Sequence, residues 1–132
     1  MKRLVLIDGH AVLYRAFYAL PKTLTTQTGE PINAVYGFSR VLFKVIAEFS
    51  PTHLVVAFDL PKPTFRHKLF KEYQVKRPKM VDDLVSQIEP IHEVVRAFDI
   101  PIFEKEGFEA DDVIGTLTQK AKVDEVIIVT GD

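Results

Sequence analysis

Six carboxylates stand at positions where the chain passes from one regular segment to the next. They are Asp8, Asp59, Glu109, Asp111, Asp112 and Asp132. Like charges gathered in one crevice repel one another unless a cation lies between them. Because the chain has no cysteine and no paired histidines, the residues predict an all-oxygen site for Mg²⁺ or Mn²⁺. Two such ions about 4 Å apart are the usual arrangement for phosphodiester hydrolysis.

The segments that must position these acids alternate between aliphatic runs and helical patterns. Strands buried on both faces are expected at 4–7, 53–58 and 127–129, with a shorter one near 100–103. Helices are expected at 10–20, 35–49, 81–98 and about 110–121, with a loop over 23–31. This alternation predicts an α/β fold with a mainly parallel central sheet flanked by helices. Ligands bind at the carboxyl ends of such strands, where Asp8, Asp59 and Asp132 are placed.

Each acid also has a purely structural explanation. Asp8 with Gly9 could turn the chain and cap the next helix, and the acids at 109, 111 and 112 could favour a helix N-terminus. Capping does not require three strands to end in aspartate, however. Their joint placement at one sheet edge therefore favours a metal site.

A basic segment follows directly after Asp59. Residues 62–79 carry seven Lys or Arg against the single acid Glu72, with Phe65, Phe70 and Tyr73 interleaved. Cations neutralise a phosphate backbone and aromatic rings stack on bases, so the segment predicts contact with nucleic acid. The alternative is a solvated amphipathic helix with its two phenylalanines in the core.

His10 allows two interpretations. It could touch substrate or orient a carboxylate, or it could simply be an N-terminal residue of the helix that follows the first strand. The serines lie in or at the end of helical patterns, so no serine nucleophile can be assigned. Isolated glycines also exclude a glycine-rich phosphate loop.

Composition sets the remaining limits. The 132 residues are 47% hydrophobic, enough for one compact core, and 17 Lys and Arg against 18 Asp and Glu give a net charge of −1. A polyanion must therefore be met by a local basic patch. No run approaches the length of a membrane span or a signal-peptide core, and cysteine is absent. We expect a cytoplasmic location and no membrane partner.

Several motifs in combination resemble a known family. They are Leu6-Ile7-Asp8-Gly9-His10, Leu13-Tyr14-Arg15-Ala16, Val56-Ala57-Phe58-Asp59, Thr64-Phe65-Arg66-His67, Arg77-Pro78, the stretch from Gly107 through Glu109-Ala110-Asp111-Asp112 to Leu117, and Val129-Thr130-Gly131-Asp132. The chain resembles the N-terminal 5′ nuclease domain of bacterial DNA polymerase I, in the flap endonuclease superfamily, over nearly its whole length. The resemblance implies a PIN-like fold.

The resemblance also implies a function and a set of residue roles. Such nucleases cut 5′ flaps, nicks and RNA primers in replication and repair, near the bacterial nucleoid, with two Mg²⁺ or Mn²⁺ ions in the complete domain. The six acids named above match the family's catalytic metal ligands. The positions that match substrate or arch contacts are Arg15, Arg66, Lys71, Tyr73, Lys76 and Arg77, and residues 62–80 correspond to the arch.

Two departures from the family are visible. Gln74 stands where the family usually has a lysine, which removes a cation beside the scissile phosphate. The family continues past Asp132 with a further aspartate, more ligands and a helix-hairpin-helix, and in the intact protein with a polymerase domain. Residues 1–132 are thus expected to be the N-terminal part of the nuclease domain, incomplete at the C-terminus. An uncovered sheet edge would favour weak activity, weak metal binding and self-association.

Two other functions compete with the leading one. A PIN-like ribonuclease would share the acids but would not explain the basic segment. A non-catalytic nucleic-acid-binding fragment would keep the segment without a working metal site.

Overall fold

A computed structural model describes residues 1–59, 80–105 and 107–131 of the chain, and of Asp111 only the backbone. The elements are β1 (Arg3–Asp8), α1 (Gly9–Ala19), α2 (Asn33–Phe49), β2 (His53–Ala57), α4 (Asp82–Ala97), β3 (Ile102–Phe103), α5 (Ala110–Lys120) and β4 (Glu125–Val129). The four strands form one parallel sheet in the order β3-β2-β1-β4. The predicted α/β fold with helices around a parallel sheet is therefore confirmed.

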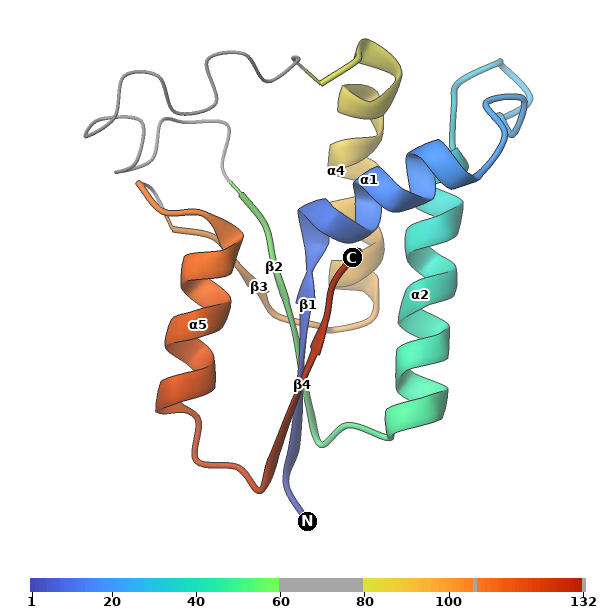
Figure 1. Ribbon diagram of the computed structural model, residues 1–132. Coiled ribbons are helices and arrows are strands. Elements are labelled where there is room, and N and C mark those ends of the chain that lie inside the picture. Colours follow the sequence, from blue (N-terminus) through green and yellow to red (C-terminus); the bar gives the residue numbers. More distant parts are fainter. Residues whose placement is uncertain (60–79, 106, 132) are drawn as a thin grey trace.

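Helices cover both faces of the sheet (Figure 1). On β1, Val5 and Ile7 face the core formed with α1, α2 and α4, whereas Leu4 and Leu6 face α5. Successive residues of a strand point to opposite faces, so a strand buried on both sides must be aliphatic at every position. This explains the uninterrupted run that marks β1 in the sequence.

The predicted element boundaries hold to within about two residues. The first helix begins at Gly9, the second begins two residues earlier than expected at Asn33, and the last strand begins two residues earlier at Glu125. The short strand is reduced to Ile102–Phe103. Helix α2 ends at Phe49 and is capped by Ser50, which adopts a left-handed conformation (φ 43°). Pro51 follows directly and cannot continue the helix.

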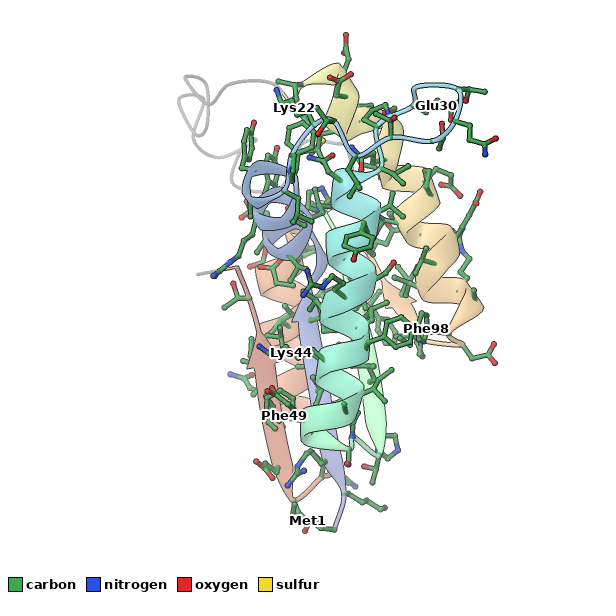
Figure 2. The ribbon with its side chains drawn as sticks, turned by 90° about the vertical axis from the view of Figure 1, so that its right-hand side faces the viewer. Met1, Lys22, Glu30, Lys44, Phe49 and Phe98 are labelled. Atoms are coloured by element: carbon green, nitrogen blue, oxygen red, sulfur yellow. The ribbon has the colours of Figure 1, made fainter. Side chains whose placement is uncertain are left out.

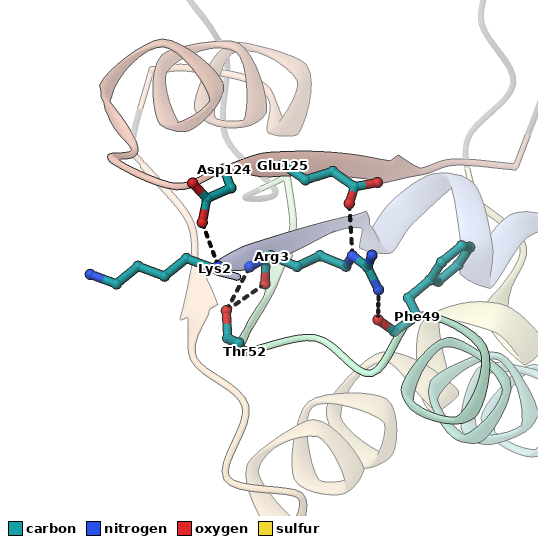
Figure 3. Close-up of polar contacts among 6 residues, drawn as sticks. All are labelled: Lys2, Arg3, Phe49, Thr52, Asp124 and Glu125. Carbon is teal, nitrogen blue, oxygen red and sulfur yellow. Dashed lines mark hydrogen bonds and ion pairs between the residues drawn. The ribbon is translucent and has the colours of Figure 1, made fainter.

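Polar contacts fix the amino-terminal end of the sheet, opposite the predicted site (Figure 3). The Arg3 side chain donates to Glu125 Oε2 at 2.9 Å and also to the carbonyl of Phe49. The Lys2 N–H donates to Asp124 Oδ2 at 2.6 Å, and the Arg3 N–H donates to Thr52 Oγ1 at 2.8 Å. These contacts join β1 to β4 and to the turn before β2. In Figure 2, Met1 marks this end, while Lys22 and Glu30 lie at the other.

A buried amide pair joins three helices. Gln87 of α4 accepts hydrogen bonds from the backbone N–H groups of Ala34 (2.7 Å) and Val35 (3.1 Å), at the start of α2. Its amide nitrogen donates to Asn33 Oδ1 at 2.9 Å, and Asn33 Nδ2 donates to the carbonyl of Phe17 in α1 at 2.8 Å. Gln87 thus acts as the missing N-terminal cap of α2 from another helix.

We expect Gly37→Ala to lower the free energy of unfolding by about 1–2 kcal/mol. A Cβ at Gly37 would lie 2.6 Å from the Cβ of Ala16 and 3.0 Å from Leu20 Cδ1, so α1 and α2 would have to separate. Gly115→Ala in α5 is the matched control, because a Cβ there meets no atom within 4 Å. That variant should gain up to about 1 kcal/mol from helix propensity. Urea unfolding of both variants measures the difference, and equal changes would contradict it.

Strands β3 and β4 are the edges of the sheet as described. Ile128 of β4 is 50% exposed. The self-association expected from the sequence stays a prediction, and the β4 edge is the surface through which we expect it.

Among the described residues, no helix has both the length and the apolar character needed to cross a membrane.

Candidate metal and nucleic-acid site

A cleft of about 520 Å³ opens at the carboxyl edge of the sheet, beside α1 and the start of α5. Its acidic lining residues are Asp8, Asp59 and Glu109. Asp8 is the last residue of β1, and Asp59 follows β2 by two residues. Because β1 and β2 are parallel neighbours in register, with Asp8 beside Ala57, their ends bring the two aspartates to the same edge.

Asp8 has two roles in the structure. As N-cap of α1, it accepts a hydrogen bond from the N–H of Ala11 at 3.2 Å through Oδ1. The capping explanation for this residue is thus correct, and the same carboxylate also lines the cleft.

Asp59 connects two helices. Its Oδ1 accepts a hydrogen bond from the N–H of Ala110, in the first turn of α5. Its own backbone N–H donates to Nδ1 of His10, on α1, at 3.0 Å. The side chain is 37% exposed, so the carboxylate can still meet a ligand in the cleft.

The acids of α5 divide between two surfaces. Glu109 is the N-cap of α5 and lines the cleft. Asp112 accepts a hydrogen bond from the Glu109 N–H at 2.9 Å. Its side chain lines a separate hollow, together with Phe103 and Phe108. One turn of helix does bring 109 and 112 together, as their spacing predicts. The Asp111 side chain and Asp132 lie outside the described residues.

The acidic side chains of the cleft offer oxygen donors, which suit Mg²⁺ or Mn²⁺, and His10 adds a single imidazole to the lining. Within residues 1–59, 80–105 and 107–131, no three acid or histidine side chains come close enough together to hold one ion. The carboxylate oxygens therefore fit the expected metal, but the described residues alone do not provide three ligands for one ion. The six-acid site stays a prediction.

Helix α1 adds two tyrosines and an arginine to the lining of the cleft. The rings of Tyr14 and Tyr18 stack with their centroids 6.5 Å apart, and Tyr18 is 66% exposed. Arg15 lies between them in sequence and donates to the carbonyl of Gly131 at 2.9 Å. The sequence analysis assigned Arg15 but missed both tyrosines, although their i, i+4 spacing one turn after His10 signals a shared helix face.

The chain after β4 passes tightly against α1. A Cβ at Gly131 would lie 2.6 Å from the carbonyl oxygen of Ala11, so a glycine is required at this approach. The Arg15 hydrogen bond holds the same peptide. These contacts bring the residue before Asp132 to the cleft.

Most of the predicted nucleic-acid contacts lie outside the described residues. They are Arg66, Lys71, Tyr73, Lys76 and Arg77, together with the rest of the basic segment 62–79. Their roles stay predictions.

The fold and the site define an α/β protein with acidic side chains at the carboxyl edge of a parallel sheet, beside aromatic and cationic residues of α1. The family model for the 5′-3′ exonuclease N-terminal resolvase-like domain matches residues 3–132. The chain belongs to this family.

Similar proteins support the same assignment. DNA polymerase I of Bacillus caldotenax is 49% identical over 99% of this chain, which spans 15% of that protein. A 5′-3′ exonuclease of Aquifex aeolicus is 47% identical over 91% of this chain, which spans 41% of that protein. The chain therefore covers less than half the length of these curated relatives.

Solved structures of the D15 protein of bacteriophage T5 have a similar fold. One, co-crystallised with metal ions, has a TM-score of 0.68 at 19% identity. Another, the flap endonuclease in a pseudo-enzyme-product complex with DNA and metal ions, has a TM-score of 0.59 at 22% identity. Each comparison covers 99% of this chain and 49% of the phage protein. At these identities the likeness concerns the fold.

Proposed function

We propose that this chain carries the amino-terminal part of a metal-dependent 5′ nuclease that hydrolyses phosphodiester bonds in DNA with 5′ flaps or nicks and in RNA primers. The observation that carries the proposal is the cleft in which Asp8, Asp59 and Glu109 meet Arg15 and two tyrosines. The family and the metal-bound and DNA-bound phage structures support it. A remainder of the nuclease domain and a polymerase domain are the proposed partners in an intact protein.

The residues of the cleft have distinct proposed roles. Bound Mg²⁺ or Mn²⁺ would supply the positive charge that activates water and stabilises the leaving 3′ oxygen. Asp8, Asp59 and Glu109 would hold the ions, together with Asp111, Asp112 and Asp132. Tyr14 and Tyr18 offer flat rings for stacking at the rim, because base-aromatic stacking tolerates any sequence. Arg15 would place a cation between the rings and the acids.

A second candidate function is nucleic-acid binding without cleavage. It is favoured by the helix-cap contacts of Asp8 and Asp59, whose carboxylates accept the N–H groups of Ala11 and Ala110. The rings of α1 and the basic segment would then bind a strand while the acids served only as helix caps.

Chelation is expected to separate the two candidates. A labelled 5′-flap DNA should be cleaved with Mg²⁺ or Mn²⁺, and EDTA should stop cleavage until excess metal restores it. The double variant Asp111→Asn, Asp112→Asn should cleave at least about a hundredfold more slowly, since it removes two of the six carboxylates proposed to hold the ions. Asparagine at 112 can still accept the hydrogen bond from the Glu109 N–H, so α5 should keep its start.

Two results would point away from the nuclease proposal. Binding of the flap with no cleavage in either protein would favour the non-catalytic candidate. Cleavage of single-stranded RNA in preference to the flap would favour a PIN-like ribonuclease. Circular dichroism of the double variant controls for loss of the fold.

A further inference from the structure

Asp59 lies just beyond the end of the strand pairing that positions it. The last β1–β2 pair is Asp8 with Ala57, and on the other side the N–H of Phe58 donates to the carbonyl of Phe103 at 3.0 Å. Successive N–H groups of a strand point to opposite sides. The N–H of Asp59 therefore points toward the β1 side, where β1 has already ended.

His10 supplies the acceptor that the ladder lacks. Its Nδ1 lies 3.0 Å from the backbone nitrogen of Asp59. Because a backbone N–H always donates, Nδ1 must accept, and the proton of the neutral ring is then on Nε2. The same nitrogen lies 3.9 Å from Asp59 Oδ2, so the ring lies beside both the backbone and the carboxylate of this residue.

The ring of His10 is itself held in place. Its side chain is only 18% exposed, and it packs edge-on against Phe58 with centroids 5.9 Å apart. Phe58 in turn stacks on the buried ring of His92 in α4, with centroids 4.2 Å apart. The Nδ1 acceptor of His10 is therefore held in place on α1, directly beside the backbone N–H that follows the end of β2.

We infer that His10 is a positioning residue for Asp59: it anchors the backbone N–H of Asp59, so that this carboxylate lines the cleft together with Asp8 and caps α5 through Ala110. The inference rests on the proposed function, because a metal site gives the placement of Asp59 its consequence. Residues that orient a metal ligand typically change metal affinity about ten- to a hundredfold when they are removed.

The test compares two variants of His10. Asparagine can offer an amide oxygen near the position of Nδ1, whereas leucine offers no acceptor. His10→Leu should weaken Mn²⁺ binding, measured by electron paramagnetic resonance, about tenfold or more, and His10→Asn should restore most of the loss. His53→Leu, at the exposed opposite end of β2, is the control and should bind Mn²⁺ as the unchanged chain does.

A second measurement needs no metal. In NMR spectra of the unchanged chain, His10 should carry its proton on Nε2, and the Asp59 amide should exchange slowly with solvent. That exchange should be fast in His10→Leu and slow in His10→Asn.

Three results would overturn the inference. The first is a neutral His10 ring in the unchanged chain that carries its proton on Nδ1. The second is an Asp59 amide that exchanges equally fast in the unchanged chain and in His10→Leu. The third is an equal Mn²⁺ affinity of these two proteins. An unchanged chain that binds no Mn²⁺ would instead overturn the proposed function, and the tautomer and exchange rates would then decide alone whether His10 anchors Asp59. If His10→Leu does not fold, the tautomer in the unchanged chain decides.

Discussion

Asp59→Asn is expected to slow cleavage of a 5′-flap DNA about a thousandfold or more, while leaving the free energy of unfolding nearly unchanged. The loss of activity follows from removing a charge that lines the cleft, since a bound ion contributes several kcal/mol to the transition state. Stability should be kept because the asparagine oxygen can still accept the hydrogen bond that the Ala110 N–H donates to Asp59 Oδ1.

Asp59→Ala should lose as much activity and, in addition, about 1 kcal/mol of stability. Alanine offers no acceptor to Ala110, and an uncapped N–H in the first turn of a helix typically costs that amount. Flap cleavage and Mn²⁺ binding measure the first effect, and urea unfolding measures the second. The pair of variants therefore separates the chemical role of one carboxylate from its structural role.

Glu93→Gln is the control for the change of charge. Glu93 is exposed on α4, and its replacement should alter neither Mn²⁺ binding nor stability. If Asp59→Asn bound Mn²⁺ as tightly as the unchanged chain, Asp59 would not be a ligand. If the asparagine and alanine variants were equally stable, the hydrogen bond to Ala110 would contribute nothing to α5.

The structural and catalytic explanations of the acids are compatible. Asp8 accepts from Ala11, Asp59 accepts from Ala110, and Asp112 accepts from Glu109. Each of these carboxylates thus lies at a helix N-terminus, where N–H groups and the helix dipole stabilise negative charge. The helix ends partly offset the repulsion between the carboxylates, an effect for which the sequence alone suggested only metal ions. They also hold Asp8 and Asp59 at the cleft, in position for such ions.

Much of the fold could be predicted because its local signals agree. The aliphatic run before Asp8 became a strand that is buried on both faces, as predicted. The three apolar residues before Thr130 also lie in a strand, but their predicted burial on both faces is wrong, because β4 is an edge strand in which Ile128 is 50% exposed. The run 53–58 was predicted in the same way, and the parallel pairing of β1 with β2 then places Asp8 and Asp59 at one edge of the sheet.

The direction of individual side chains could not be predicted in the same way. Asp112 shares a helix face with Glu109, yet it lines the hollow beside Phe103 and Phe108 rather than the cleft. That outcome depends on how α5 packs on the sheet, which no spacing within the helix determines. His10 likewise had two interpretations until the end of β2 was placed beside it.

Gln87 had no signal in the sequence, although it is 1% exposed in the structure. A glutamine in an amphipathic helix is ordinarily a surface residue. Its role follows only from tertiary packing, because α2 begins at Asn33 without a side-chain cap of its own. The start of α2 meets α4 at this point, and Gln87 supplies the acceptor for Ala34 and Val35.

Gln87→Leu is expected to lower the free energy of unfolding by about 3 kcal/mol or more. The variant would leave buried N–H groups of Ala34 and Val35 without an acceptor and Asn33 Oδ1 without its donor, at about 1–3 kcal/mol for each unsatisfied group. Urea unfolding measures the change, with an unaltered m-value showing that the unfolded state is the same. Gln119→Leu, at an exposed position of α5, is the control and should change stability by less than about 0.5 kcal/mol.

A double-mutant cycle with Asn33→Leu tests whether the two amides act as one unit. Asn33 donates to the carbonyls of Phe17 and Leu20, so it joins the end of α1 to the start of α2. Loss of either amide already leaves the other without its hydrogen-bond partner. The second substitution should therefore lower the free energy of unfolding by at least about 1 kcal/mol less in the double variant than it does in the single variant. Additive effects would mean that Gln87 stabilises α2 only through Ala34 and Val35, independently of the link to α1.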